Sequence, residues 1–537
     1  MSAVEQQFAI EEVSRGTRTV RVFKENFSCL GEILNCLDLH AQHDLVVADD
    51  TRLTFAETKR HSAHLAGYLS ANHNIMPGDR VGLALPNSTE WIVAFIAITS
   101  LGAVPALINA RAGREEIEHC LISTGCTLCL HARDDIPEDI PELAMADIAR
   151  IASADHAEDL PHTLRARDDE ALLMFTSGTT GLPKAASLSH ESVLTSLKTI
   201  QYSSALIAEQ MATAYGIDYE TLLQMRPPTV NLLIFPLFHV SGCHAVFLTS
   251  LVQGGKIVLL NKWDTHTALS LIEQEKVTAF PAVPTMYRDI LNLTDRETYD
   301  LSSLTSLSVG GQATPPALLA DIHAAFPNAI LGTGYGMTES NGTVTLMVGE
   351  PFINNSSSVG RLVSTLDAQI RDDAGDVLDI GMSGEIFIRG AALMTGYANA
   401  DEDPFDDQGW FSTGDIGYFD ETGLLYIVDR KIDMVISGGE NIYCAEVERA
   451  VDLHPAIRES AAFGLPDERL GEKVIAIAVP EPGKHITVEM LADHCLEHLA
   501  RHKAPKEIYL QQVPLARNAS GKLVKRAIKA THLERSL

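Results

Sequence analysis

The stretch LLMFTSGTTGLPKAASLSH, residues 172–190, decides the interpretation of this chain. A buried strand over residues 172–175 is expected to lead into a loop of hydroxyl side chains and glycines, with a lysine beyond a proline. Glycines let backbone amides converge on an anion, hydroxyls add donors, and the lysine adds a positive charge. The pattern predicts a phosphate-binding loop formed by Thr176, Ser177, Gly178, Thr179, Thr180, Gly181 and Lys184.

This loop is not a Walker A motif, because Pro183 stands where that motif, counted from Gly178, has the glycine of its Gly-Lys pair. A Ser/Thr-rich surface turn is the structural alternative. Such a turn would need neither a buried strand before it nor a lysine held beyond a proline, so phosphate binding is favoured.

A second glycine-rich stretch, LGTGYGMTES, covers residues 331–340. Its glycines are expected to bring the backbone close to a flat ligand, with Tyr335 offering an aromatic face. Thr338 offers a hydroxyl group, and Glu339 offers a carboxylate suited to magnesium. It is no dinucleotide-binding fingerprint, because Met337 replaces the third glycine. Taken alone, a glycine turn with a packed tyrosine explains the stretch equally well.

Three further stretches each carry one charged residue that is a candidate for contact with a ligand. Asp415 in WFSTGDIGYFD could accept hydrogen bonds from ribose hydroxyls, or could simply cap a turn. Arg430 is the second residue of DRKIDMVISGGENIYCAEVE, in which Gly438 and Gly439 leave a strand edge without side chains. Lys522 follows a glycine in RNASGKLVKR. For these last two stretches, an ordinary solvated turn is the better explanation when each is considered alone.

Together these motifs, in this order, resemble the acyl-CoA synthetases of the acyl-adenylate-forming superfamily, which includes luciferase and the adenylation domains of peptide synthetases. The resemblance covers nearly the whole chain, from GDRVGLALPNSTEWIVAFIA at residues 78–97 to Lys522. It implies an ATP- and Mg²⁺-dependent acid–thiol ligase. A carboxylic acid and ATP would give acyl-AMP and pyrophosphate, and coenzyme A would then form the thioester and release AMP.

The resemblance also implies roles for residues. The 176–184 loop would hold the β- and γ-phosphates, Glu339 would bind magnesium, and Lys522 would bridge the substrate carboxylate and the α-phosphate. The remaining nucleotide contacts implied are Gly311, Thr333, Gly334, Tyr335, Thr338, Asp415 and Arg430. The catalytic residues implied are Lys184, His239, Thr338, Glu339 and Lys522.

The acyl pocket, the coenzyme A channel and the hinge follow from the same resemblance. The implied acyl pocket consists of His239, Val240, Ser241, Val309, Gly310, Gly311, Gly334 and Met337. The implied channel for coenzyme A passes His239, Gly438 and Gly439, and the implied hinge is Lys431 and Ile432. A buried core histidine is the alternative for His239.

Some positions depart from the family pattern. Ala185 replaces the usual glycine after the loop lysine, Ala516 replaces a usual proline, and Ile432 replaces the usual Asp or Lys at the hinge. Ser241 stands where some aryl-acid ligases carry an aromatic residue, which favours a roomier pocket.

The order of elements predicts a mixed α/β fold. Apolar runs such as DRVGLALP, TLCLHA, TVNLLIFP and KIVLL alternate with helical periods, which is typical of parallel sheets covered on both faces. From residue 356 to 429, short runs separated by turns at Gly375, Gly384 and Gly423 indicate antiparallel strands or a small barrel. We expect a large domain, residues 1–429, of two parallel-sheet subdomains plus a barrel-like subdomain, and a small mobile α+β domain, residues 430–537.

Composition limits the function classes. The 537 residues carry a formal charge of −30, which argues against nucleic acid as the main partner. The charge is uneven: residues 501–535 hold nine basic and two acidic side chains, suited to closing over phosphates. Eight cysteines without zinc-finger spacing predict buried thiols. The run WIVAFIAITSLGAVPALIN at residues 91–109 could be mistaken for a membrane span, but a buried helix, a turn and a buried strand fit it better.

Several questions stay open at this stage. The acyl acceptor could instead be a carrier-protein thiol, and a non-catalytic nucleotide-binding relative is a third hypothesis. The acid could be fatty, alicyclic or aryl, so a place in fatty acid metabolism is only one interpretation. The amino terminus lacks the basic and apolar regions of a signal peptide, which predicts a cytoplasmic protein. A homodimer is possible, and residues 201–230 form a helical excursion of unknown role.

Overall fold

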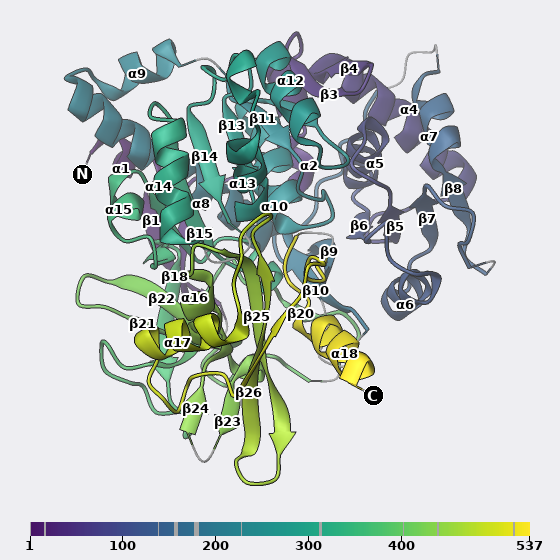
Figure 1. Cartoon of the computed structure of the whole chain (residues 1–537). Helices are drawn as coiled ribbons and strands as arrows, with labels where there is room; N and C mark the ends of the chain where they lie inside the picture. Colours follow the sequence, from purple (N-terminus) through teal and green to yellow (C-terminus); the bar gives the residue numbers. More distant parts are fainter. Residues whose placement is uncertain are drawn as a thin grey trace.

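The computed structural model describes residues 2–15, 18–137, 139–154, 159–176, 182–226, 228–310, 314–400, 402–437, 440–518 and 521–536. Two large sheets with helices form the N-terminal domain, and a smaller sheet with three helices forms the C-terminal domain (Figure 1). The predicted mixed α/β class is therefore confirmed.

The first sheet of the N-terminal domain has seven strands. Its central strands pair in parallel, as their continuous apolar runs predicted, whereas β10 and β20 add antiparallel strands at one edge. In sheet order the strands are β20 (Gly396–Tyr397), β10 (Lys184–Ser189), β9 (Glu170–Thr176), β6 (Val104–Leu107), β5 (Arg80–Ala84), β7 (Leu128–His131) and β8 (Glu142–Ala144).

The second sheet has thirteen strands and changes character along its width. One half is parallel except for its antiparallel edge strand, and the other half is built from antiparallel ribbons. In sheet order the strands are β18 (Leu366–Arg371), β19 (Gly384–Gly390), β21 (Phe411–Phe419), β22 (Leu424–Arg430), β17 (Gly360–Leu362), β16 (Thr345–Val348), β15 (Ile330–Tyr335), β14 (Ser306–Val309), β13 (Ala279–Ala282), β11 (Val230–Leu233), β12 (Lys256–Leu259), β3 (Asp44–Ala48) and β4 (Thr51–Thr54).

The strands expected to form a barrel-like unit are thus antiparallel, and they continue the second sheet. Gly375 and Gly423 lie in turns at φ +89° and +79°, as predicted. Gly384 instead begins strand β19, where a side chain would collide with the carbonyl of Arg371.

Helices cover these sheets. The main ones are α4 (Phe55–His73), α5 (Thr89–Ser100), α6 (Arg114–Thr124), α7 (Met145–Ala152), α8 (His190–Tyr215), α9 (Tyr219–Met225), α12 (Thr265–Glu275), α13 (Pro284–Asn292) and α14 (Pro316–Ala325). Shorter helices and turns are α1 (Ala3–Gln7), α2 (Leu30–Ile33), α3 (Cys36–Leu39), α10 (Val240–Gly242), η1 (Cys243–Leu248), α11 (Thr249–Gln253), η2 (Arg296–Thr298), η3 (Thr338–Ser340) and α15 (Glu350–Asn354).

The long apolar run at residues 91–109 folds as predicted. Helix α5 begins after Ser88, whose side chain accepts a hydrogen bond from the Trp91 amide, and a turn at Gly102 leads into buried strand β6. Among the described helices, none has both the length and the apolar character needed to cross a bilayer. All eight cysteines are buried and unpaired.

The helical excursion extends a helix of the core. Helix α8 continues to Tyr215, ends at Gly216 with φ +68°, and is followed by α9. The ring of Tyr202 on α8 packs against Phe8 and Phe23 of the amino-terminal segment, with ring centroids 5.4 and 6.0 Å away. That segment includes the antiparallel pair β1 (Ile10–Arg15) and β2 (Arg18–Phe23).

The C-terminal domain is a sheet of five strands flanked by helices. Its strands are β24 (Glu440–Ile442), β23 (Val435–Ser437), β26 (Gly471–Pro480), β25 (Ile457–Asp467) and β27 (Glu507–Leu510). Its helices are α16 (Cys444–Asp452), α17 (Val488–His498) and α18 (Lys525–Ser536). The short turn η4 (Lys431–Asp433) joins it to β22.

Candidate active site

The candidate site lies where four neighbouring parallel strands end. Strands β11, β13, β14 and β15 pair in parallel, so their carboxyl ends share one edge of the second sheet. His239 follows β11, Val283 follows β13, Val309 ends β14 and Tyr335 ends β15. Chain reversal after β15, which pairs antiparallel with β16, opens this edge to ligands.

Tyr335 and Asp415 are joined at this edge. The Tyr335 hydroxyl donates a 2.6 Å hydrogen bond to Asp415 Oδ2, and Arg430 Nε lies 3.4 Å from Oδ1. Burial raises the pKa of the Asp415 carboxyl, while Tyr335, Arg430 and Lys522 act in the opposite direction. The sequence placed these residues in four separate motifs, and the structure brings all of them together.

Asp415 comes from strand β21, directly opposite Arg430 of β22. Gly414 before it has φ +71°, a conformation that a residue with a side chain rarely adopts. The Asp415 amide donates to the Thr413 hydroxyl. The motif around Asp415 therefore forms an irregular point within a strand, and the carboxylate contacts Tyr335 and Arg430 instead of capping a helix.

Glu339 lies in the turn η3, next to the strands of the first sheet. The Tyr397 hydroxyl donates a 2.9 Å hydrogen bond to Glu339 Oε1. Lys184 Nζ lies 5.3 Å from the centre of the same Tyr397 ring. Tyr397 thus connects the predicted metal ligand to the predicted phosphate-loop lysine, a link that the sequence analysis missed.

These contacts fit a magnesium site. Glu339 offers a hard carboxylate, one oxygen of which is already oriented by Tyr397. Mg²⁺ usually takes one or two carboxylates and fills its remaining positions with water and phosphate oxygens. Thr338, the neighbour of Glu339 in the same turn, places a hydroxyl group nearby.

Lys522 reaches the site from the C-terminal domain. Its charge acts on Asp415 and His239, and the charges of Asp415 and Glu339 act on it in turn. Lys522 keeps much of its surface accessible to solvent. Protein atoms nevertheless surround its ammonium group closely enough that desolvation, followed by the charge of Arg430, lowers its pKa.

A compact turn holds Lys522 in this position. The Asn518 amide donates to the Lys522 carbonyl at 2.8 Å, and the Lys522 amide donates to Asn518 Oδ1 at 2.9 Å. Gly521, at φ +82°, lies against the side chain of Val283, where an added Cβ would come within 3.4 Å. The turn from the C-terminal domain therefore packs directly on the end of β13.

A second contact docks the two domains. Arg288 of helix α13 donates to the Arg458 carbonyl and to Glu481 Oε1, at 2.5 and 3.1 Å. Asp289 lies 3.9 Å from Arg458. No sequence motif marked these residues, because each is an ordinary surface charge until the two domains meet.

His239 lines the same region. Desolvation, and to a lesser extent the charge of Lys522, lowers the pKa of His239 to about 4, so the imidazole is neutral at pH 7. Val240 and Ser241 follow it in helix α10, and Val309 is buried at the end of β14. A side chain at Gly310 would meet nothing within 4 Å, so there is open space beside it.

The glycines of the 331–340 stretch also have a structural role that the sequence did not predict. A Cβ at Gly336 would lie 1.4 Å from the Gly342 carbonyl oxygen, and one at Gly334 would lie 2.8 Å from that of Thr345. These glycines permit close approach of neighbouring backbone, not only of a ligand. Thr333 pairs with Met347 in the same β15–β16 ribbon, and Met337 directly precedes η3.

Part of the predicted site cannot be placed. Thr176 ends β9 opposite Lys184, which begins β10, so the predicted phosphate loop connects an antiparallel pair. Eight predicted residues lie outside the described part of the chain: Ser177, Gly178, Thr179, Thr180, Gly181, Gly311, Gly438 and Gly439.

The predicted hinge residues differ in their surroundings. Lys431 Nζ lies 2.8 Å from Glu385 and 3.3 Å from Asp373, both in the N-terminal domain. The side chain of Ile432 is 72% exposed. An apolar side chain this exposed is only lightly packed in the present arrangement.

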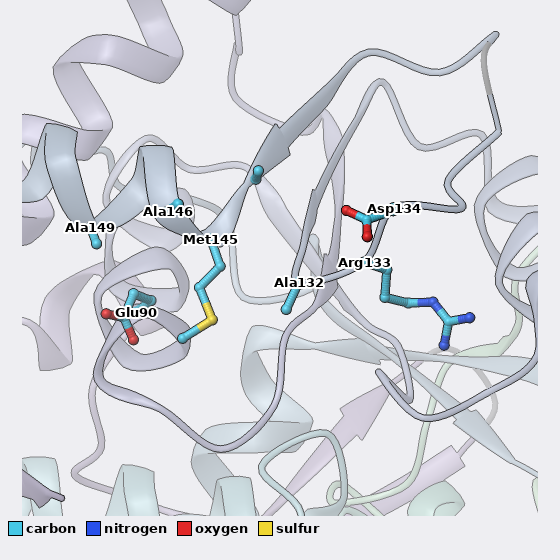
Figure 2. A pocket seen from close by; sticks show the side chains of 8 residues that line it. Glu90, Ala132, Arg133, Asp134, Met145, Ala146 and Ala149 are labelled. Carbon is cyan, nitrogen blue, oxygen red and sulfur yellow. The ribbon is translucent and has the colours of Figure 1, made fainter.

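A pocket elsewhere in the first sheet shares no residue with this site (Figure 2). Met145 and Glu90 lie on one side of it, while the Arg133 side chain points away from Met145. Arg133 forms paired hydrogen bonds of 2.7 Å with Asp135. Its guanidinium is therefore already engaged, and the pocket does not alter the placement of the active site.

Comparisons with known proteins agree with the site. Residues 37–398 match the family described as AMP-binding enzyme, and residues 446–522 match its C-terminal domain. The chain is 33% identical over 497 residues to a long-chain-fatty-acid–CoA ligase of Mycobacterium tuberculosis, covering 89% of this chain and 93% of the relative. It is also 33% identical over 490 residues to feruloyl-CoA synthase of an Amycolatopsis species, covering 89% and 94%.

Solved structures show the same fold. An o-succinylbenzoate CoA synthetase of Bacillus subtilis, in complex with its acyl-adenylate intermediate, gives a TM-score of 0.76 at 28% identity, over 94% of this chain and 98% of that chain. The same synthetase in complex with ATP and a magnesium ion gives a TM-score of 0.74 at 29% identity, over 92% and 99%.

Proposed function

Because the chain belongs to the AMP-binding enzyme family, we propose how its own residues divide the work of an AMP-forming acid:CoA ligase. Enzymes of this kind convert a carboxylic acid and ATP into acyl-AMP and pyrophosphate, then transfer the acyl group to coenzyme A and release AMP. The substrates are therefore an acid, ATP and coenzyme A, and the metal is Mg²⁺.

The observation that carries the proposal is the position of Lys522. An acid must approach a triphosphate of the same charge sign, so the first step needs positive charge between them. The charges of Arg430, Asp415 and Glu339 act on Lys522, and the charge of Lys522 acts on His239. In this role Lys522 bridges the substrate carboxylate and the α-phosphate, and neutralises both partners of the attack.

The other nucleotide contacts follow from the same arrangement. Asp415 and Arg430 hold the ribose, the Tyr335 ring faces the adenine, and Thr338 donates to the α-phosphate. Thr176 to Gly181 and Lys184 hold the β- and γ-phosphates, with Gly311, Thr333 and Gly334 along the adenine edge. Glu339 would hold Mg²⁺, which neutralises phosphate charge when bound.

We infer that the acid is bulky and largely apolar. The acyl pocket would be lined by His239, Val240, Ser241, Val309, Gly310, Gly311, Gly334 and Met337. The open space beside Gly310 and the small Ser241 side chain leave room for a large group. The neutral imidazole of His239 suits an uncharged acyl chain. Relatives named for long-chain fatty acids and for ferulic acid support this size class.

We also propose a boundary and a pivot between the domains. Residues 1–429 form the nucleotide-binding domain, and residues 430–537 form a domain that rotates about Lys431 and Ile432. Strand β22 ends at Arg430, and the two family matches leave this junction between them. Rotation withdraws Lys522 and lets coenzyme A approach along His239, Gly438 and Gly439.

The test separates the two half-reactions. In Lys522→Ala, acid-dependent pyrophosphate exchange should fall by roughly 100-fold or more, because the loss of one preorganised donor to a transition state typically lowers the rate by this factor. Thioester formation from supplied acyl-AMP and coenzyme A should stay within about threefold of the unaltered protein. The partly exposed Lys529→Ala serves as the control. Equal loss of both half-reactions would contradict the role of Lys522. A panel of fatty, alicyclic and aryl acids tests the acid class, and the absence of pyrophosphate exchange with every acid in it would contradict that class.

A further inference from the structure

Outside the active site, the C-terminal domain gathers metal-binding side chains on one helix. His494, Glu497 and His498 in the stretch HCLEH occupy positions i, i+3 and i+4 of α17, so they project from one face. One ligand atom from each lies within 4.8 Å of the others. No residue of the active site belongs to this helix.

The tautomer of His494 is already set for coordination. Its Nε2 lies 3.0 Å from the Ala450 carbonyl oxygen of helix α16. A carbonyl can only accept, so this nitrogen carries the proton and Nδ1 keeps its lone pair. Histidines that bind metals usually donate their second ring N–H to a carbonyl or carboxylate in this way.

His454 completes one wall of the cluster without being a ligand. Its ring is nearly perpendicular to that of His494, with centroids 5.0 Å apart. The Ala456 amide donates to His454 Nδ1 at 3.1 Å, so the neutral ring carries its proton on Nε2. Its Nδ1 already accepts a hydrogen bond and its Nε2 is protonated, so neither nitrogen is available to a metal. His494, Glu497 and His498 remain as the three ligands.

We propose that His494, Glu497 and His498 bind a divalent transition metal of the zinc class. Two imidazole nitrogens and one carboxylate oxygen suit Zn²⁺, Ni²⁺ or Co²⁺, whereas Mg²⁺ prefers oxygen ligands alone. Three protein ligands leave a fourth tetrahedral position for water. The chain would then use two metals at two places, Mg²⁺ beside the nucleotide and a zinc-class ion on the moving domain.

The arrangement has a competing explanation in simple helix electrostatics. His498 is the last residue of α17, where a protonated histidine interacts favourably with the helix dipole. That explanation requires neither Glu497 nor the free Nδ1 of His494. Variants of the three residues therefore separate the two explanations.

The experiment measures Zn²⁺ binding to the full-length protein. Metal-stripped protein without nucleotide is dialysed against Zn²⁺ buffered by a competing chelator, and bound metal is counted by mass spectrometry. We expect one Zn²⁺ per chain, bound roughly 100-fold more weakly in His498→Ala and in His494→Ala, because even outer-shell changes cost about 10–100-fold. His485→Ala, an exposed histidine of the same domain outside the cluster, should bind Zn²⁺ like the unaltered protein.

A second measurement protects the test against misfolding. Co²⁺ should give visible d–d absorption that Zn²⁺ abolishes, and Glu497→Gln should weaken it while circular dichroism stays unchanged. Equal Zn²⁺ binding in the unaltered protein, His494→Ala and His498→Ala would overturn the proposal. Displacement of Co²⁺ by a modest excess of Mg²⁺, or equal weakening in His485→Ala, would overturn it as well.

Discussion

At the scale of single residues, Tyr397 has the most testable position. It donates to the carboxylate of Glu339 and lies beside Lys184, yet it comes from a two-residue strand at the sheet edge. We interpret it as a positioning residue that orients the metal ligand, because it touches Glu339 and not the reacting atoms.

Tyr397→Phe should raise the Mg²⁺ concentration needed for half-maximal acid-dependent pyrophosphate exchange by roughly tenfold. A hydrogen bond to a charged group contributes about 1.5–3 kcal/mol, and the variant removes one while keeping the ring. The control is Tyr418→Phe, whose ring stacks on Tyr426 with centroids 5.0 Å apart. An unchanged Mg²⁺ titration in Tyr397→Phe would exclude this role.

The site residues that could be predicted from the sequence are those that lie in short motifs. Asp415, Glu339 and Lys522 each sit in a local pattern of glycines and hydroxyl residues, because the backbone geometry that presents them is local. Tyr397 lies 58 positions from Glu339, so no window of sequence contains the pair. Arg288 and Glu481 could not be predicted for the same reason, since they meet only where the two domains dock.

At the scale of elements, helix α13 bears one of the contacts that hold the C-terminal domain in its present position. Arg288→Ala should lower acid-dependent pyrophosphate exchange by roughly tenfold, because it removes two hydrogen bonds of a charged side chain from this arrangement alone. Thioester formation from supplied acyl-AMP should be unaffected or faster. Arg296→Ala, on the turn after α13, is the control, and parallel loss of both half-reactions would exclude an effect on domain position.

Many of the strands could be predicted from the sequence, but the strands with which they pair could not. Continuous apolar runs identified β5, β7, β11 and β12, because strands buried on both faces must be apolar throughout. The antiparallel strands after residue 356 were also recognised by their turns. Their continuation of the second sheet depends on the pairing of β17 with β16 and β22, and strand partners far apart in sequence leave no local pattern.

At the scale of the whole molecule, buried histidines make stability depend on pH. Desolvation lowers the pKa of both His190 and His244 to about 4. The unfolded chain binds protons at these groups from about pH 6.5, so their contribution to stability is present above that pH and is lost as the pH falls towards 4. Buried Glu448 and Asp452, whose pKa values rise to about 7 and 6, change stability in the opposite direction.

The contribution of one histidine is therefore measured by difference. Between pH 7 and pH 5, the free energy of unfolding should fall by roughly 2 kcal/mol more in the unaltered protein than in His244→Gln, which cannot take up the proton. Urea denaturation at both values provides the measurement. The same pH dependence in both proteins would show that His244 is not held neutral by burial.

The pairing of Asp415 with Arg430 across β21 and β22 has a consequence for the order of events in turnover. In the proposed function, Arg430 would hold the ribose, and it is also the last residue of β22 before the proposed pivot. Conversion of bound ATP to AMP would then directly affect the residue next to the pivot of the domain rotation. No conformational change would have to pass through the core. Departure of AMP and return of the tail lysine should accordingly happen together, as one kinetic step.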